Sequence, residues 1–437
     1  MSEKVDTADA GRGSGPAAVA ATTTHGGRRA AMSFILIAVL IDMVSIGLII
    51  PVLPPLVGTF TQNETQHTLA QLAVAFAFGL ANFFGSPILG GLSDRFGRRK
   101  VMLIGFSGLA LSFFVTAMAD ALWMLVVVRL FSGAMQANAA VANAYVADIT
   151  PPAQRAKRFG MLGAAFGMGF ILGPVMGGLL GAIDLHLPFY VAGTLALLNW
   201  LYGFFVLPES LAPEHRRAFD WRKANPVAAL GRLRQLSGVG PLIYVIACSG
   251  LAQLVIQTSW VLYNQHKFGW GPKENGLSLF VVGLVAVVVQ GVLLQPLMRW
   301  LGARRLVLIG LTTSILTNVI WGLSTEAWMM VGAIFLNICG VAAGPAMQGL
   351  ISNAADARTQ GETMGAVAAI NSLMAVISPI AGLGLMALVA ELPKTDWRIG
   401  APFYLCALLQ LASLGFAWRH FHAEPPAQAE PAEPAQA

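Results

Sequence analysis

Long stretches without a charged residue constrain the fold of this 437-residue chain more than any other feature. Nine such stretches have about 20 residues or more, the length that an α-helix needs to cross a bilayer. They are residues 65–93, 159–183, 185–208, 235–266, 275–298, 306–325, 327–355, 363–390 and 399–418. Only 11% of the residues are charged, against roughly 25% in soluble domains, so a soluble globular fold is excluded.

Three further apolar segments bring the expected number of membrane spans to twelve. Residues 101–119 form a slightly shorter uncharged run, whereas residues 32–57 and 121–147 are each interrupted by one charge, Asp42 and Arg129. The segments lack the two-residue alternation of membrane strands, and lipid admits only helices and closed barrels. The sequence therefore predicts an all-α membrane protein with twelve transmembrane helices.

The distribution of Lys and Arg predicts the orientation of these spans. With twelve spans, 22 basic residues fall on one side, Arg129 lies within the membrane, and four fall on the other side, namely Lys267, Lys273, Lys394 and Arg398. Basic loops stay in the cytoplasm, so both termini are expected there, with the protein in the inner (plasma) membrane. The net charge of +6 then reflects the membrane topology; the lipid bilayer is an expected partner, and no nucleic-acid partner is expected.

An internal repeat predicts two pseudo-symmetric six-helix bundles. Residues 98–105 match residues 303–310 at an offset of 205, and the same offset carries Gly97 onto Gly302 and Pro174 onto Pro379. The expected segments are a disordered tail (1–31), a first bundle (32–207), a cytoplasmic linker (208–240), a second bundle (241–420) and a second disordered tail (421–437).

The turn after the second span carries the sequence GLSDRFGRRK, residues 91–100. It resembles the signature loop of the major facilitator superfamily, a family of two-bundle transporters. The resemblance implies a cytoplasmic gate in which Asp94, Arg98 and Asp148, the last at the end of the fourth span, form an ion-pair network. Gly91, Arg95 and Gly97 complete the motif. The plainer alternative is a turn that only supplies cytoplasmic positive charge.

Glycines recur in the fifth span, within GFILGPVMGG at residues 169–178. This segment resembles the motif of the antiporters in the same superfamily, with Gly169, Gly173, Pro174, Gly177 and Gly178 at its fixed positions. Glycines four residues apart allow two helices to approach closely, and proline removes a backbone donor. A generic tight helix contact is the alternative interpretation.

Asp42 is the only acidic residue far inside a predicted span. An intramembrane carboxylate is expensive and is by default a functional candidate. The sequence from Asp42 to Gly47 and on to Pro54 resembles the first helix of the drug:proton antiporters, notably the tetracycline/proton branch. Arg129 with Gly133 resembles the fourth-helix motif, in which the arginine is linked to proton transfer. The resemblance implies proton coupling by Asp42 and Arg129; a structural ion pair between them is the alternative.

The residues available for the substrate differ from those of the tetracycline exporters. Ser112, Ala286 and Ser314 stand where that branch carries an acid, a histidine and a second acid, which makes tetracycline itself a doubtful substrate. Uncharged polar and aromatic residues remain as candidates for the substrate cavity: Gln136, Asn138, Gln253, Gln257, Trp260, Gln290 and Gln348. Most of them are equally compatible with a hydrogen bond between helices.

Together these features predict a proton-coupled antiporter that exports a small, mainly apolar molecule, such as a drug, by alternating access. A symporter or uniporter for a metabolite is the alternative. An enzyme is not expected, because the histidines lie in loops, tails or span ends and no nucleophiles or metal ligands converge. The prediction includes no cofactor and no metal, and its partners are the substrate and protons, with the protein as a monomer.

Overall fold

The computed structural model describes residues 23–136, 138–151, 154–221, 225, 240–354 and 360–423, and every regular element in these ranges is a helix. The first half contains α1 (Thr23–Ile49), α2 (Leu53–Gly58), α3 (Glu64–Phe96), α4 (Arg98–Ala117), α5 (Leu122–Met135), α6 (Asn138–Ile149), α7 (Arg155–Gly181) and α8 (Leu187–Val206). The second half contains α10 (Gly240–Phe268), α11 (Pro272–Val288), the π-helix η4 (Val289–Leu293), α12 (Leu294–Leu323), α13 (Ala327–Leu336), α14 (Ile338–Ala354), α15 (Gln360–Val389) and α16 (Ala401–Ala423).

Ten of the described helical segments are long and apolar enough to span a membrane, and the pair α13 and α14, bent by 45°, makes an eleventh. One segment, Pro272–Leu323, has 52 residues. A straight helix of that length would measure roughly 78 Å, more than twice the hydrocarbon thickness. Its backbone breaks at Gly302, which has φ 73° and ψ 156°. A division there would supply the twelfth span of the sequence-based expectation.

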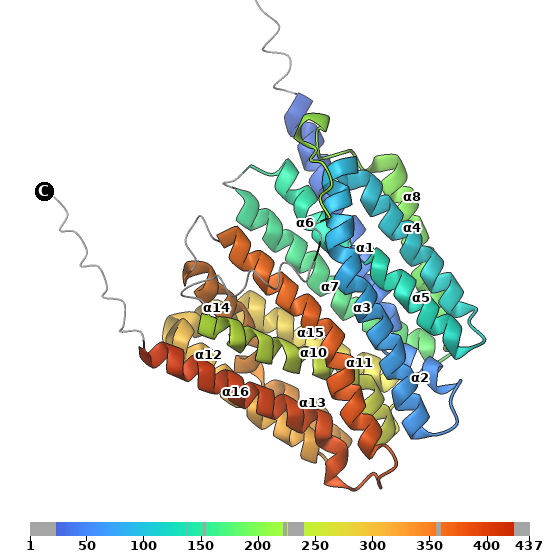
Figure 1. Ribbon diagram of the computed structural model, residues 1–437, viewed down its shortest axis with the longest axis vertical. Coiled ribbons are helices and arrows are strands. Elements are labelled where there is room, and N and C mark those ends of the chain that lie inside the picture. The colour runs from blue at the N-terminus through green and yellow to red at the C-terminus, as the bar shows by residue number, and fades with distance from the viewer. Residues whose placement is uncertain are drawn as a thin grey trace, which may run out of the picture.

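The helices form two bundles with separate cores, which confirms the predicted fold class. Buried residues of the first bundle extend from Met32 to Leu207, and those of the second from Leu242 to Ala417. In the first bundle α1 packs on α7 and α3 packs on α5; in the second, α10 packs on α15 and α16. Figure 1 shows the two bundles side by side, with the second ending at the C-terminal tail.

The halves meet along two helix pairs, α3 with α15 and α7 with α11 (Figure 1). Polar contacts join them near the start of α3. Glu64 Oε2 lies 3.2 Å from His266 Nδ1 on α10, and the Thr65 hydroxyl donates a 2.9 Å hydrogen bond to Glu391, just after α15. The halves are therefore held together at the end of the molecule where α3 begins.

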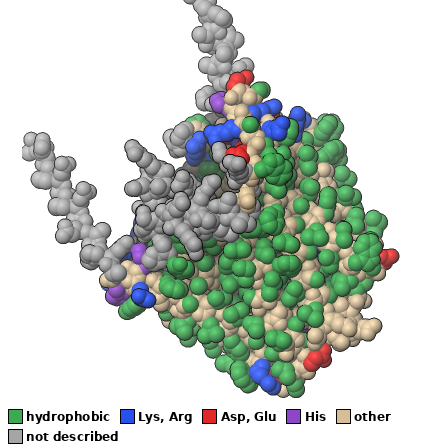
Figure 2. All heavy atoms as spheres, viewed as in Figure 1, with side chains coloured by type: hydrophobic (Ala, Val, Ile, Leu, Met, Phe, Trp, Pro, Cys, Tyr) green, Lys and Arg blue, Asp and Glu red, His purple; other side chains and the backbone are tan. Residues whose placement is uncertain are grey.

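The other end, where α3 ends and α4 begins, is called here the basic end because it carries Arg95, Arg98, Arg99 and Lys100. Figure 2 shows Lys and Arg side chains gathered there, above a broad hydrophobic surface. A Cβ atom placed on Gly160 or Gly163 of α7 would meet no atom within 4 Å, and the same holds for Gly344 of α14. These three positions of α7 and α14 therefore face open space rather than a packed neighbour.

Two of the predicted segment boundaries differ from the structure. The first helix begins at Thr23 rather than Met32, and the last continues to Ala423 rather than residue 420. A helix that is already nucleated in the membrane extends at low cost, since each added residue gains one backbone hydrogen bond. The predicted disorder of residues 1–22 and 424–437 falls outside the described residues, and the remaining boundaries stay predictions.

The closed end of the interface can be tested by cross-linking. Cysteines at Thr65 and Glu391, in a variant without the native cysteines, are expected to react with a short bifunctional thiol reagent, because the two side chains are hydrogen-bonded in the structure. The measurement is the shift in gel mobility after a protease cut in the linker. A control pair at Gly163 and Gly344 should stay unlinked, and preferential linking of the control pair would contradict the described arrangement.

Candidate functional site

The turn between α3 and α4 brings together the predicted gate residues Asp94, Arg98 and Asp148. The Arg98 guanidinium lies 2.5 Å from Asp94 and 3.2 Å from Asp148 at the end of α6, and it donates a 2.6 Å hydrogen bond to Ser93. Gly97 has φ 103°, a conformation that favours glycine, and it allows α4 to begin directly after α3. The guanidinium thus joins three helices of the first half.

Glu209, which sequence reasoning missed, completes this network from the segment that follows α8. Its carboxylate accepts a 2.8 Å hydrogen bond from the backbone amide of Arg98, and the neighbouring Ser210 donates a 3.1 Å bond to Asp148. The sequence gives no signal for Glu209, because its partner is 111 positions away. Within the described residues every partner of Arg98 lies in the first half or just after it, so the network does not join the two halves there.

The other two motif residues at this turn lie beside the network rather than in it. A Cβ on Gly91 would lie 2.9 Å from the ring of Phe219, so this glycine makes room for the segment after α8. Arg95 is exposed, and its guanidinium lies 5.0 Å from the centroid of the Phe96 ring. The turn thus contacts the start of the linker through Gly91, whereas Arg95 faces outward.

The glycines of the antiporter motif place α7 in backbone contact with α1. A Cβ on Gly173 would lie 2.6 Å from Gly47 Cα, and one on Gly177 would overlap the carbonyl of Leu48. Gly169 faces Met43 in the same way. No larger residue fits at these positions unless the two helices separate, because the atoms that would be met are mostly backbone.

Gly178 and Pro174 turn toward α11 of the other half. A Cβ on Gly178 would lie 2.6 Å from the carbonyl oxygen of Pro272 and 3.0 Å from Gly276 Cα. A Cβ on Gly276 would in turn lie 2.5 Å from the carbonyl oxygen of Pro174. The motif therefore packs one helix on two sides, against α1 within its own half and against α11 across the interface.

Asp42 is buried in the middle of α1, with 3% of its surface exposed. Its carboxylate accepts a 3.3 Å hydrogen bond from the side-chain amide of Asn138, the first residue of α6. Gly105 of α4 leaves the space that Asn138 occupies, since a Cβ there would overlap the amide oxygen. Asn138 was predicted to line a substrate cavity; the structure instead places it against the candidate proton site.

Arg129 is also buried, on α5, but it forms no ion pair with Asp42 within the described residues. Its Nε and Nη2 atoms have no hydrogen-bond partner. Beside it lies a small cavity of about 40 Å³, which Ser132 and Gln136 also line. The alternative of a standing Asp42–Arg129 pair is therefore not seen in this conformation, and an unpaired buried guanidinium marks a functional candidate.

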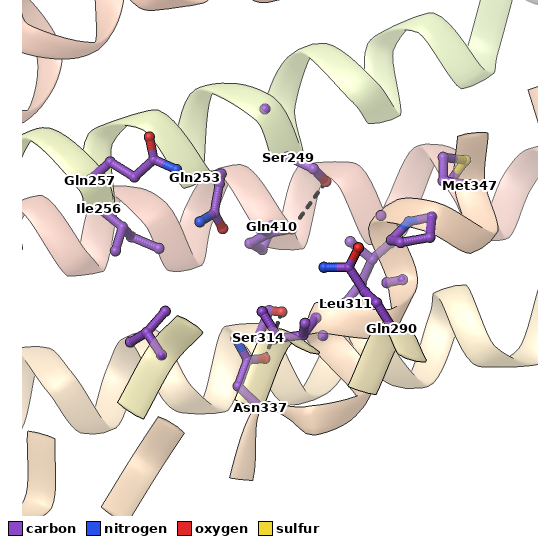
Figure 3. A pocket seen from close by; sticks show the side chains of 18 of the residues that line it. Ser249, Gln253, Ile256, Gln257, Gln290, Leu311, Ser314, Asn337, Met347 and Gln410 are labelled. Atoms are coloured by element: carbon purple, nitrogen blue, oxygen red, sulfur yellow. Dashed lines mark hydrogen bonds between the residues drawn. The ribbon is translucent and has the colours of Figure 1, made fainter. Parts of the chain in front are cut away.

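A second, larger cavity of about 580 Å³ lies in the second half and is bordered on the first half by Phe170 of α7. Five of the seven predicted cavity residues line it: Gln253, Gln257, Trp260, Gln290 and Gln348. Figure 3 shows Gln253 reaching from α10 toward Ser314 and Gln290 on the far side. Drug-sized ligands occupy pockets of roughly 300–1,000 Å³, so this cavity has a suitable size.

Sequence reasoning missed several polar residues of this cavity. Ser249 donates a 3.1 Å hydrogen bond to Gln410, and Ser314 donates a 2.9 Å bond to Asn337, both drawn in Figure 3. Ser249, Gln253 and Gln257 are four residues apart and so share one face of a helix. This spacing could have identified Ser249 as a cavity residue from the sequence. Asn337 lies at the break between α13 and α14, which the sequence did not reveal.

The three positions that depart from the tetracycline exporters separate in the structure. Ala286 and Ser314 line the large cavity. Ser112 is buried within α4, and its hydroxyl donates to the backbone of Leu109. The two positions in the second half therefore border the candidate substrate site, whereas the third belongs to helix packing.

Two helical bundles, with a buried carboxylate in the first and a drug-sized cavity in the second, are the architecture of a membrane transporter. The chain belongs to the Major Facilitator Superfamily, whose family model matches residues 35–317 and 291–437. This membership confirms the resemblance found in the sequence, and it places the chain among multi-pass membrane transporters.

Sequence relatives include proteins of antibiotic resistance. The class C tetracycline resistance protein of Escherichia coli is 35% identical over 379 residues, which are 86% of this chain and 95% of that protein. The class B protein of the same organism is 34% identical over 86% of this chain and 93% of its own length. Multidrug resistance protein 2 of Bacillus subtilis is 29% identical over 86% and 92%, respectively. These relatives bear out the expected drug:proton antiporter branch.

Solved structures share the fold at low sequence identity. A nucleoside transporter superposes with a TM-score of 0.71 at 15% identity, covering 90% of this chain and 99% of that one. A bacterial homologue of the human lysosomal transporter Spinster, in an inward-facing and unoccupied conformation, gives 0.70 at 16% identity, covering 92% and 100%.

The backbone contact of Gly178 predicts a shift between conformations. Gly178→Ala places a Cβ against backbone atoms of α11 that no side-chain rotation can move. Overpacking of this kind costs about 1–3 kcal/mol, which would favour separation of the closed end by roughly 5- to 150-fold. The measurement is the labelling rate of a single cysteine at Thr65. Gly163→Ala on the same helix is the control, and an equal rate in both variants would contradict this packing role.

Proposed function

We propose that this protein is a proton-coupled antiporter that exports a small, mainly apolar molecule by alternating access. The observation that carries the proposal is Asp42, a buried carboxylate with one amide partner and no cation partner among the described residues. Such a group is costly in a membrane and is kept where protons move. The 580 Å³ cavity supplies the separate place for the exported molecule.

The names of the relatives suggest a drug as the cargo of this chain, and a tetracycline-like ring system is one candidate. Ala286 and Ser314 make tetracycline itself a poor candidate. Both line the cavity, and they replace the histidine and the acid that the tetracycline exporters have at these positions. The proposal therefore keeps the transport class and leaves the cargo broader than in the named relatives.

The proposed orientation puts the basic end in the cytoplasm of a bacterial inner membrane, with both termini on that side and the protein working as a monomer. Positive-inside charge supports this, since Arg95, Arg98, Arg99 and Lys100 gather at one end. The described conformation is then inward-facing, because the halves touch at the other end through Glu64 and Thr65.

The turn network is proposed to bias the balance between conformations. Arg98 holds Asp94 and Asp148 together while the halves are apart, and the backbone amide of Arg217 donates a 3.1 Å hydrogen bond to the carbonyl of Asp94. The linker is thereby attached to the turn. A change in the position of either half would strain or break these contacts. Because their free energy then differs between the two conformations, the ion pairs bias the equilibrium between them.

Neutralising Asp42 tests the proton site. Asp42→Asn keeps the size of the side chain and a carbonyl for Asn138, so a folded protein that still binds substrate is expected. Uptake driven by a pH gradient in inverted vesicles should fall to background, because the amide cannot carry a proton. Asp120→Asn, in an exposed loop, is the control. Full proton-driven uptake by Asp42→Asn would show that Asp42 does not carry the proton.

If Asp42 and Arg129 instead pair in another conformation for structural reasons, the same variant behaves differently. Removing one member of a buried pair destabilises a protein by about 3–5 kcal/mol. Thermal unfolding of Asp42→Asn in detergent separates the two explanations: an unchanged melting temperature supports the proton site, whereas a large decrease supports the structural pair.

The gate proposal predicts that Asp94→Asn impairs transport more than it impairs substrate binding. The substitution removes the negative charge that pairs with Arg98 at the basic end, and it leaves the lining of the cavity unaltered. Transport rate and binding affinity are measured on the same preparation. Arg95→Gln is the matched control, since Arg95 belongs to the motif but faces outward. Equal transport rates in both variants would show that the turn only supplies positive charge for membrane topology and does not act as a gate.

The orientation is tested by labelling intact cells with a membrane-impermeant thiol reagent. Single cysteines are placed at Arg217 and Lys394, two exposed positions at opposite ends, in a variant without Cys248, Cys339 and Cys406. The cysteine at Lys394 should react, and the one at Arg217 should react only after the cells are opened. Rapid labelling at Arg217 in intact cells would reverse the proposed topology.

A further inference from the structure

Among the described residues that line the large cavity, none has an ionisable side chain. All of its lining residues are apolar, aromatic or carry a hydroxyl or carboxamide group. The amides of Gln253, Gln257, Gln290 and Gln348 form no hydrogen bond within the described residues, and all four side chains are exposed in the structure. Each carboxamide offers both a donor and an acceptor, so the wall presents unpaired polar groups of both kinds without a net charge.

The repeat shows how the second half differs from the first. At the offset of 205, α5 beginning at Leu122 corresponds to α13 beginning at Ala327, and Arg129 then corresponds to Ile334. Ile334 lines the cavity, as does Ala343, the counterpart of Asn138. The positions equivalent to Arg129 and to Asn138, the partner of Asp42, are therefore apolar in the half that forms the cavity.

The candidate proton site does not supply a charge to this cavity either. Asp42 does not line it and is almost completely buried beside Asn138. Arg129 lines the separate 40 Å³ cavity. A charged molecule in the large cavity would exchange its hydration for carboxamide dipoles without a counter-charge, which is unfavourable. An uncharged molecule would gain hydrogen bonds from the free amides and contact with the ring of Phe170, which is exposed at the border of the cavity.

We propose that the substrates are uncharged aromatic molecules bearing carbonyl, hydroxyl or amide groups, and that their export is electrogenic. This inference rests on the proposed proton exchange. If a neutral molecule leaves while a proton enters, each cycle moves net positive charge inward. Exchange of a monovalent cation for one proton would instead move no net charge. The class of substrate and the response to membrane potential are thus two consequences of the same uncharged wall.

The test uses the full-length protein in inverted vesicles and two pairs of probes. Chloramphenicol and linezolid are neutral aromatic amides; ethidium and tetraphenylphosphonium are permanent aromatic cations. With an acidic lumen and the potential clamped at zero by valinomycin and potassium, uptake of a neutral probe should exceed uptake of either cation by about tenfold or more. A lumen-positive potassium diffusion potential, without a pH gradient, should by itself drive uptake of the same neutral probe.

The outcomes separate this inference from the proposed function. If the pH gradient drives the cations and not the neutral probes, or if the potential has no effect on neutral uptake, the inference is wrong while proton-coupled transport stands. If neither gradient moves any probe in vesicles with the folded protein, the proposed function fails and this inference fails with it. Asp42→Asn vesicles give the background for every arm.

A charge placed in the wall provides a second measurement. Gln257→Glu is expected to raise the ratio of ethidium uptake to chloramphenicol uptake by about tenfold at alkaline external pH, since the cavity then contains a counter-charge. Gln257→Met, which removes the amide without adding a charge, is the control and should not raise that ratio. An unchanged ratio in Gln257→Glu would show that the charge of the wall does not select the substrate.

Discussion

The close contact of α7 with α1 on one side and with α11 on the other is the interaction on which the rest of this structure depends. Gly173 and Gly177 allow the backbones of α7 and α1 to touch, and Gly178 does the same with Gly276 of α11. Glycine is needed because the neighbouring atoms are backbone and cannot rotate away. The helix with Asp42 and the helix that borders the large cavity are thereby packed on the same intermediate helix.

This packing gives a physical route between the two candidate sites. Asp42 lies next to Met43, which faces Gly169 of α7, and a Cβ on Gly283 of α11 would lie 2.6 Å from Ile171 of α7. Close contacts of this kind transmit a displacement with little loss, because close-packed interiors are difficult to compress. A movement of α7 would therefore change the surroundings of the proposed proton site and the wall of the cavity together.

The charges are distributed unequally over two halves that share one fold. Asp94 and Arg98 pair at the basic end of the first half, whereas the offset of 205 places Arg299 and Ala303 at the corresponding positions of the second half. The second turn keeps the glycine with positive φ, Gly302, and has no comparable acid. The repeat thus preserves the glycine conformation that makes the turn, whereas the Asp94–Arg98 pair has no counterpart in the residues of the second copy.

The sequence by itself determined the all-α fold, the two halves and the identities of Asp42, Arg98 and the α7 glycines, because these depend on hydrophobic length, local motifs and a periodic offset. The tertiary structure decided which groups meet. It placed Asn138 beside Asp42, added Glu209 to the turn network and separated Asp42 from Arg129. It also gathered Ser249, Asn337 and Gln410 around one cavity. These pairings join residues distant in sequence, and helix packing, rather than any local spacing, brings them into contact.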